Sequence, residues 1–140
     1  MNRIETNCLS PGVIKESDLT YVVMCARYKG EWIFVRHVER ETWEMPAGHI
    51  EKEESAHQAA VRELFEEAGV IRSHLVHICD YSVTVQSKTE YGRLYGAQVK
   101  ALQPHLEHEI EELLFSNQLP LNLTYPEVQT ILFERAQQHF

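Results

Sequence analysis

The sequence lacks any long hydrophobic run, since nothing in its 140 residues approaches the roughly 18 consecutive apolar residues of a membrane span. The opening stretch, MNRIETNCLSPG, also lacks the apolar core of a secretory signal peptide. We therefore expect a cytoplasmic protein that does not interact with membranes.

Cysteine is scarce, and histidine follows no metal-binding pattern. Cys8, Cys25 and Cys79 lie far apart and form no CxxC pair, and the eight histidines include no HExxH spacing. These absences argue against a zinc site and against a disulfide framework. We expect three free thiols in a reducing compartment.

Basic residues are outnumbered, with 13 Lys and Arg against 21 Asp and Glu, for a net charge of −8. This balance argues against broad binding to nucleic acid, which needs basic patches. The net negative charge also disfavours binding of a polyanionic small molecule, unless a cation lies between that molecule and the protein. With 44% hydrophobic and 24% charged residues, we expect one globular domain over residues 1–140.

Residues 55–68 have the pattern of an amphipathic helix. Ser55 is a candidate N-cap, and Gly69 suits the left-handed residue that ends a helix. Apolar residues recur at i, i+3, i+4 and i+7, which predicts a buried stripe of Val61, Leu64, Phe65 and Ala68.

Glu63, Glu66 and Glu67 recur at i, i+3 and i+4, so a helix projects their carboxylates together. Mg²⁺ and Mn²⁺ prefer oxygen ligands, and Arg62 can orient a carboxylate through its forked guanidinium. The alternative is an ordinary solvated face, because like-charged helix neighbours cost only about 0.2–0.5 kcal/mol per pair.

The wider spacing decides between these interpretations. Gly48 is followed after five residues by Glu54 and after seven more by RELFEEAGV, residues 62–70, and the preceding WEMPAG belongs to the same pattern. This stretch resembles the signature of the Nudix hydrolases at every fixed position. A generic surface helix needs neither the glycines nor Glu54 and Arg62.

Outside this stretch, residues that favour strands dominate five segments: 21–28, 31–37, 73–85, 94–102 and 110–115. We expect a hairpin at Lys29-Gly30, a loop over residues 38–42, and polar segments at 86–92 and 104–109. Pro126 opens a second helix, which runs to Gln138 and packs inward through Val128, Ile131, Leu132 and Phe133. The expected fold is an α/β/α sandwich with a mixed β-sheet, which agrees with the Nudix fold.

The resemblance implies a set of site residues. Glu66 and Glu67 are expected as ligands of Mg²⁺ or Mn²⁺, Glu63 as a further ligand or the general base, and Glu54 and Arg62 as their support. The residue before the signature glycine, Ala47, is expected to offer its carbonyl oxygen to the metal. A downstream glutamate can instead be the base, with Glu109, Glu111 and Glu112 as candidates, although a charged strand edge explains them equally. Trp43 suits a core or rim aromatic.

The resemblance also implies the reaction, which is attack of water on a nucleoside diphosphate linked to another group. We expect a small-molecule nucleotide, in the first place a nucleoside triphosphate such as 8-oxo-dGTP, giving the monophosphate and pyrophosphate. One alternative is an ADP-ribose or nucleotide-sugar pyrophosphatase, although Gln86 stands where that subgroup has a proline. Another is a nucleotide-sensing module without catalysis. Family members often form homodimers, so we include that assembly as an expectation.

Overall fold

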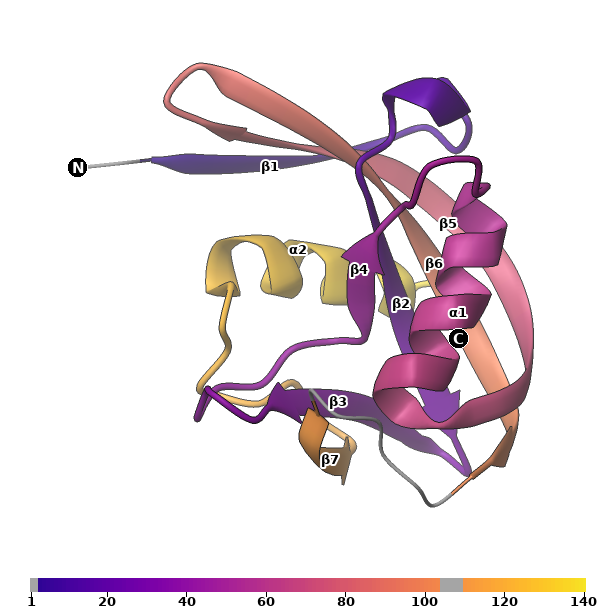
Figure 1. Cartoon of the computed structure of the whole chain (residues 1–140). Helices are drawn as coiled ribbons and strands as arrows, with labels where there is room; N and C mark the ends of the chain where they lie inside the picture. Colours follow the sequence, from indigo (N-terminus) through magenta and orange to yellow (C-terminus); the bar gives the residue numbers. More distant parts are fainter. Residues whose placement is uncertain (1–2, 104–109) are drawn as a thin grey trace.

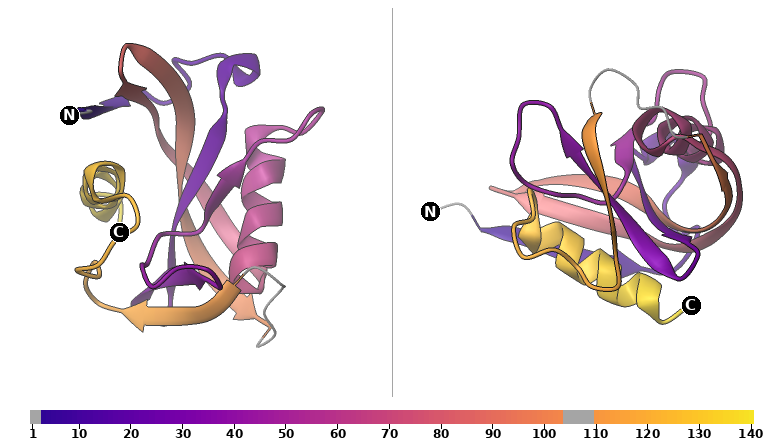
Figure 2. Two further views of the ribbon diagram at one scale, coloured as in Figure 1. Left: turned by 60° about the vertical axis from the view of Figure 1, so that its left-hand side comes forward. Right: turned by 90° about the horizontal axis from the view of Figure 1, so that it is seen from below.

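A mixed β-sheet lies between two helices in the computed structural model, which describes residues 3–103 and 110–140 (Figures 1 and 2). The strands are β1 (Ile4–Leu9), β2 (Tyr21–Tyr28), β3 (Glu31–His37), β4 (Ala47–His49), β5 (Val70–Val85), β6 (Lys88–Leu102) and β7 (Ile110–Ser116). The helices are α1 (Ala56–Ala68) and α2 (Pro126–Gln137), and a short 3-10 turn covers Glu16–Asp18. The expected α/β/α sandwich is confirmed.

The strand order is β1-β5-β6-β2-β3-β7, and β4 pairs with β2 outside this path. β2 and β6 run parallel, whereas the other pairs are antiparallel, so the sheet is mixed as expected. Figure 2 shows α1 on one side of the sheet and α2 on the other.

Alternation along the central strands builds a core on each side of the sheet. Val22 and Met24 pack toward α1, while Val23 and Cys25 pack toward α2. Because successive strand residues point to opposite faces, a strand buried on both faces is apolar throughout, as β2 is.

Local capping explains the bounds of α1. The Ser55 hydroxyl accepts the Gln58 N–H at 3.0 Å, and the Gln58 side chain accepts the Ser55 N–H at 2.9 Å, which forms a capping box. Gly69 ends the helix with φ +68°. Both predicted caps are confirmed, and they fix where the helix starts and stops along the chain.

The predicted buried stripes were partly wrong. Leu64 and Ala68 are buried in α1, but Val61 and Phe65 are 49% and 40% exposed. The buried face instead carries Ala56, Ala59, Ala60 and Glu67 beside Leu64 and Ala68. Small alanines allow the helix to lie close to the sheet, and the rotation of the helix brings Glu67 inward.

In α2, Leu132 and Phe133 are buried and Val128 packs against the core, but Ile131 is 38% exposed. Gln129 is buried in its place, because its side-chain oxygen accepts the Met45 N–H at 2.7 Å. The helix ends at Gln137, one residue before the prediction.

Three strands are longer than predicted: β7 by one residue, to Ser116, and β5 and β6 by several residues. β5 starts at Val70 and β6 at Lys88, so most of the supposed polar break over residues 86–92 belongs to β6. Only Gln86 and Ser87 form the turn, with φ of +51° and +67°. Two positive φ values suit the tight turn that joins twisted antiparallel strands. The expected hairpin at Lys29-Gly30 and the loop over residues 38–42 are confirmed.

The buried side chain of Arg93 binds the segment that precedes β2 to the rest of the fold. Arg93 of β6 donates to Asp80 of β5 at 2.8 Å and to Glu16 at 2.5 Å, and the other Glu16 oxygen accepts the first N–H of α1, from Ala56, at 2.9 Å. Asp80 also accepts the Ile14 N–H at 3.0 Å. This network ties residues 14–16 to the sheet and to the start of α1.

Within the described part of the chain, no helix is long and apolar enough to cross a membrane. All three cysteines are free thiols, as predicted, with Cys25 and Cys79 buried and Cys8 half-buried.

Candidate active site

The site is built where β4 passes the second half of α1. Gly48 leaves no room for a side chain, because the Glu63 oxygens lie within 2.5 and 2.6 Å of the place where a Cβ would stand. The Glu63 side chain is only 12% exposed. Burial and the nearby charge of Glu67 raise the pKa of Glu63 to about 7.

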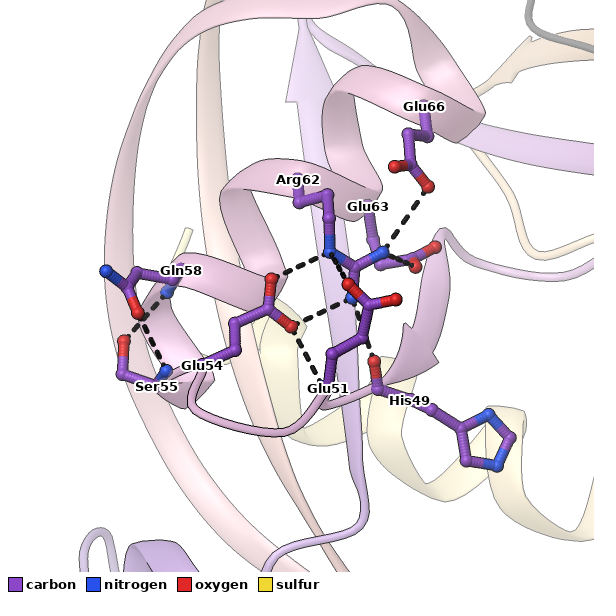
Figure 3. Close-up of polar contacts among 8 residues, drawn as sticks. All are labelled: His49, Glu51, Glu54, Ser55, Gln58, Arg62, Glu63 and Glu66. Atoms are coloured by element: carbon purple, nitrogen blue, oxygen red, sulfur yellow. Dashed lines mark hydrogen bonds and ion pairs between the residues drawn. The ribbon is translucent and has the colours of Figure 1, made fainter.

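Arg62 is the centre of the polar contacts on this face, and Figure 3 shows the carboxylates gathered around it. Its Nε and Nη2 donate to the two oxygens of Glu54 at 2.7 and 2.9 Å, and Nη2 also donates to the His49 carbonyl at 3.0 Å. Nη1 reaches Glu63 at 2.5 Å and Glu66 at 3.3 Å. The hydrogen bond from Arg62 lowers the pKa of Glu54. Arg62 therefore ties the loop before α1 to the carboxylate face.

Glu67 points inward, with a side chain only 11% exposed. One oxygen accepts the Ala47 N–H at 2.9 Å. The other lies 3.3 Å from Nε2 of His37, which stands 2.7 Å from a Glu44 oxygen. The hydrogen bond to Glu67 raises the pKa of His37, and burial raises that of Glu44. Three elements, α1, β3 and β4, thus meet at the Glu67 carboxylate.

Sequence reasoning missed His37 and Glu44. His37 continues the inward-facing series Ile33, Val35, His37 in β3, and Glu44 follows Trp43 directly. A histidine at the end of an apolar strand face was therefore the available signal. Trp43 itself is half-buried and packs on the core beneath α2, as the rim or core interpretation expected.

The structure brings together most of the residues that the sequence singled out: Ala47, Glu54, Arg62, Glu63, Glu66 and Glu67. Ala47 takes part through its N–H, which donates to Glu67, whereas the sequence analysis expected its carbonyl oxygen to contact a metal. Glu109 lies outside the described residues, as does the side chain of Glu111. Glu112 accepts Nε and Nη2 of Arg36 at 3.2 and 3.1 Å, which is the charged strand edge considered above.

The donor chemistry at this site fits a hard divalent cation, because three carboxylates and a backbone strand supply oxygen ligands. Across residues 3–103 and 110–140, however, no three His, Cys, Asp or Glu side chains are grouped closely enough to hold an ion. Binding of such a cation would therefore require the carboxylates to move closer together. Glu66, 48% exposed and held by Arg62 only at 3.3 Å, has room to turn.

The fold and this geometry define a class, namely an α/β/α sandwich with a carboxylate cluster placed where a helix meets a glycine-bearing strand. Residues 13–130 match the family model described as NUDIX domain. The chain belongs to the NUDIX family.

Two curated relatives show where the sequence is similar to known proteins. YtkD of Bacillus subtilis (strain 168), whose name assigns it provisionally as an 8-oxo-dGTP diphosphatase, is 30% identical over 105 residues, which are 74% of this chain and 66% of YtkD. The RNA pyrophosphohydrolase of Shewanella sp. (strain W3-18-1) is 39% identical over 57 residues, covering 41% of this chain and 32% of that protein. The chain thus matches less than two thirds of the length of either relative.

Solved structures agree on the fold. The Bacillus subtilis pyrophosphohydrolase BsRppH superposes with a TM-score of 0.78 at 22% identity, over 99% of this chain and 92% of that one. The NUDIX domain of Shewanella oneidensis NrtR, solved with ADP ribose, gives 0.69 at 17% identity, over 93% and 92%. At these identities the likeness shows the fold alone.

Proposed function

We propose that this protein is a metal-dependent pyrophosphohydrolase of nucleotides. The observation that carries the proposal is the placement of Glu63, with its carboxylate buried against Gly48 and next to Glu67. A solvated helix face does not need a glycine on the neighbouring strand. A face that draws acidic groups together out of water suits a bound cation.

In this proposal Glu66, Glu67 and the Ala47 carbonyl oxygen bind Mg²⁺ or Mn²⁺, and Glu63 is a further ligand or the base. Glu54 and Arg62 hold these groups in place through the contacts described above. Glu109 stays the alternative base. Membership in the NUDIX family supports the roles of Glu54, Arg62, Glu63, Glu66 and Glu67, since these five residues occupy fixed positions of the signature.

A divalent cation held by Glu66, Glu67 and the Ala47 carbonyl oxygen would neutralise phosphate charge and lower the pKa of the attacking water, so that the water would be a nucleophile near neutral pH. The oxygen of the water forms a new bond to phosphorus, and the bond between that phosphorus and the bridging oxygen breaks. A carboxylate of the site accepts the proton that the water loses. The products are a nucleoside monophosphate and pyrophosphate when the substrate is a triphosphate.

For the substrate we favour a nucleoside triphosphate, including oxidised purines such as 8-oxo-dGTP, and the name of YtkD supports this choice. The name of the Shewanella relative favours a second candidate, the 5′-triphosphate end of an RNA. The two share a 5′-triphosphate. The net charge of −8 disfavours extended contact with an RNA backbone.

The test is a product assay with Mg²⁺ or Mn²⁺ over nucleoside triphosphates, 8-oxo-dGTP, 5′-triphosphorylated RNA, ADP-ribose and nucleotide sugars. Metal-dependent release of pyrophosphate supports the leading proposal, and the preferred compound identifies the substrate. Release of AMP and ribose phosphate from ADP-ribose moves the assignment to that alternative. Binding without turnover of any compound indicates a nucleotide-sensing module.

A further inference from the structure

A histidine bridges two buried carboxylates beside the candidate metal ligands. We infer that His37 is a positioning residue that orients the Glu67 carboxylate, and that Glu44 anchors His37. The inference rests on the proposed function, in which Glu67 is a metal ligand. It adds His37, which lies outside the NUDIX signature, and gives a role to Glu44, which the sequence analysis placed in the WEMPAG entry to the signature without a function.

The strand directs His37 to this place. Ile33 and Val35 of β3 pack in the core on the α1 side, and His37 is the next residue of that alternating series. The pairing of β3 with β7 shifts register between Arg36 and His37. The additional residue lies on β7, since the consecutive residues Arg36 and His37 pair with Glu112 and Ile110. β3 therefore keeps its alternation, and His37 stays on the same face as Ile33 and Val35.

The contacts fix the direction of the hydrogen bonds. Nε2 of His37 lies 2.7 Å from Glu44 and 3.3 Å from Glu67. An ionised carboxylate only accepts, so Nε2 carries a proton, and the Glu44 and Glu67 oxygens share this one hydrogen as acceptors. The second Glu67 oxygen accepts the Ala47 N–H at 2.9 Å. Donors from two strands therefore hold the carboxylate of a helix residue.

Burial makes a donor between the two carboxylates favourable, above all for Glu67, since the other Glu44 oxygen also lies 3.5 Å from Nη1 of Arg40. The Glu44 and Glu67 side chains are 10% and 11% exposed, and buried carboxylates are costly without a donor. Glu44 cannot move away, because its main chain pairs with Val35 in both directions, at 2.8 and 3.0 Å. Without the imidazole, Glu67 faces a second acid, and Ala47 is its one remaining hydrogen-bond partner among the described residues.

The bridge leaves Glu67 able to bind a cation. A carboxylate has about four lone-pair sites, of which the two donors occupy two. Hydrogen-bond partners of metal ligands orient them, and losing one typically weakens metal binding or activity by about 10–100-fold.

Two amide substitutions at His37 test whether the position of the hydrogen-bond donor matters, because both keep a polar side chain and differ in its length. Glutamine places a donor near the Nε2 position of histidine, whereas asparagine is one carbon shorter and falls short of Glu67. We expect His37→Asn to weaken Mn²⁺ binding by about 10–100-fold and His37→Gln to stay within about threefold of wild type. The measurement is a titration of metal-free protein followed by electron paramagnetic resonance, without substrate.

His77→Asn is the matched control. His77 also places Nε2 2.8 Å from a buried acid, Asp80, and its side chain is 28% exposed against 25% for His37. It contacts none of the candidate ligands. We expect this variant to bind Mn²⁺ as wild type does. That result would show that losing a contact between a histidine and a buried acid does not by itself weaken metal binding.

The Glu67→Gln variant distinguishes a failure of the positioning role of His37 from a failure of the proposed metal site. If Glu67→Gln loses Mn²⁺ affinity while His37→Asn keeps it, the positioning role is overturned and the proposed metal site stands. If Glu67→Gln itself binds normally, the ligand assignment fails and this inference fails with it. Should His37→Asn not fold, Glu44→Ala removes the anchor and is expected to weaken binding about tenfold. Wild-type affinity in that variant overturns the inference.

Discussion

The Glu63 carboxyl carbon lies 2.2 Å from the position that a Cβ on Gly48 would occupy. Gly48 has no left-handed backbone angle, since only Gly12, Gly30 and Gly69 among the glycines have positive φ. The glycine is therefore required for space and not for backbone freedom. The substituted carbon would displace the group that we assign to the metal or to the proton transfer.

Gly48→Ala is expected to inactivate the protein without unfolding it. The atoms in conflict are the end of a flexible side chain, so Glu63 can turn away at small cost, but a misplacement of about 1 Å in a catalytic group can cost about 10²-fold. Turnover of the preferred substrate and the free energy of unfolding should both be measured.

Gly92→Ala provides the comparison, because its Cβ would meet the buried Tyr81 ring at 2.3 Å. Overpacking there should cost about 1–3 kcal/mol of stability and leave the activity of the folded molecules intact. Equal activity loss in the two variants would mean that Gly48 acts through stability alone.

Sequence reasoning succeeded for this site where the information is local. Ser55 and Gly69 set the ends of α1, and the spacing of Glu63, Glu66 and Glu67 put their carboxylates on one helix. It failed on rotation, because Val61 and Phe65 looked like core residues. The rotation places Glu67 against Ala47, a contact between residues 20 positions apart that the helix pattern alone does not show.

Contacts between distant segments could not be predicted either. His37 and Glu67 are brought together by the packing of β3 against α1, which joins segments far apart in the sequence. The turn at Gln86 and Ser87 lacks the glycine or asparagine that usually marks two positive φ values, so it was read as a longer break.

Glu67→Gln is expected to lower turnover by at least about 10²-fold and to leave the fold intact. Glutamine keeps an oxygen that can accept the Ala47 N–H, so the main structural contact survives while the charge is lost. Glu134→Gln, on the exposed side of α2, is the control and should retain full turnover. Near-normal turnover in Glu67→Gln would contradict the ligand assignment.

Asp80→Asn is expected to destabilise the fold in a pH-dependent way. Burial alone raises the pKa of Asp80, but hydrogen bonds from Arg93, the Ile14 N–H and His77 outweigh it, and the net pKa is lowered from 3.8. The carboxylate therefore contributes stability above about pH 3.8, and this is lost as the pH falls through the lower pKa of the folded state.

At pH 7 the substitution leaves the buried Arg93 without its main partner, which should cost about 3–5 kcal/mol in the free energy of unfolding. The difference from wild type should shrink in denaturant titrations below pH 3.8, the ordinary value for this group. Asp18→Asn, at an exposed position, should change stability by less than about 0.5 kcal/mol. If the loss of stability in Asp80→Asn stays constant with pH, the shape of the side chain at residue 80 matters and its charge does not.

Arg62→Lys tests whether the guanidinium fork matters beyond its charge. Arg62 donates from two nitrogens to both oxygens of Glu54, and Nη2 also reaches the His49 carbonyl, a set of directions that a single ammonium cannot reproduce. Lysine should therefore release Glu54 and the loop before α1, and let Glu63 shift. We expect kcat/KM to fall by about 10- to 100-fold with most of the stability retained.

The matched control is Arg36→Lys, since Arg36 is 21% exposed against 23% for Arg62 and donates from Nε and Nη2 to Glu112. That pair lies on β3 and β7, so its loss should leave kcat/KM unchanged. Raising the metal concentration should restore part of the activity of Arg62→Lys if the displaced carboxylates are metal ligands, because excess cation draws them back together. An Arg62→Lys variant with wild-type kcat/KM would show that only the positive charge at residue 62 is needed.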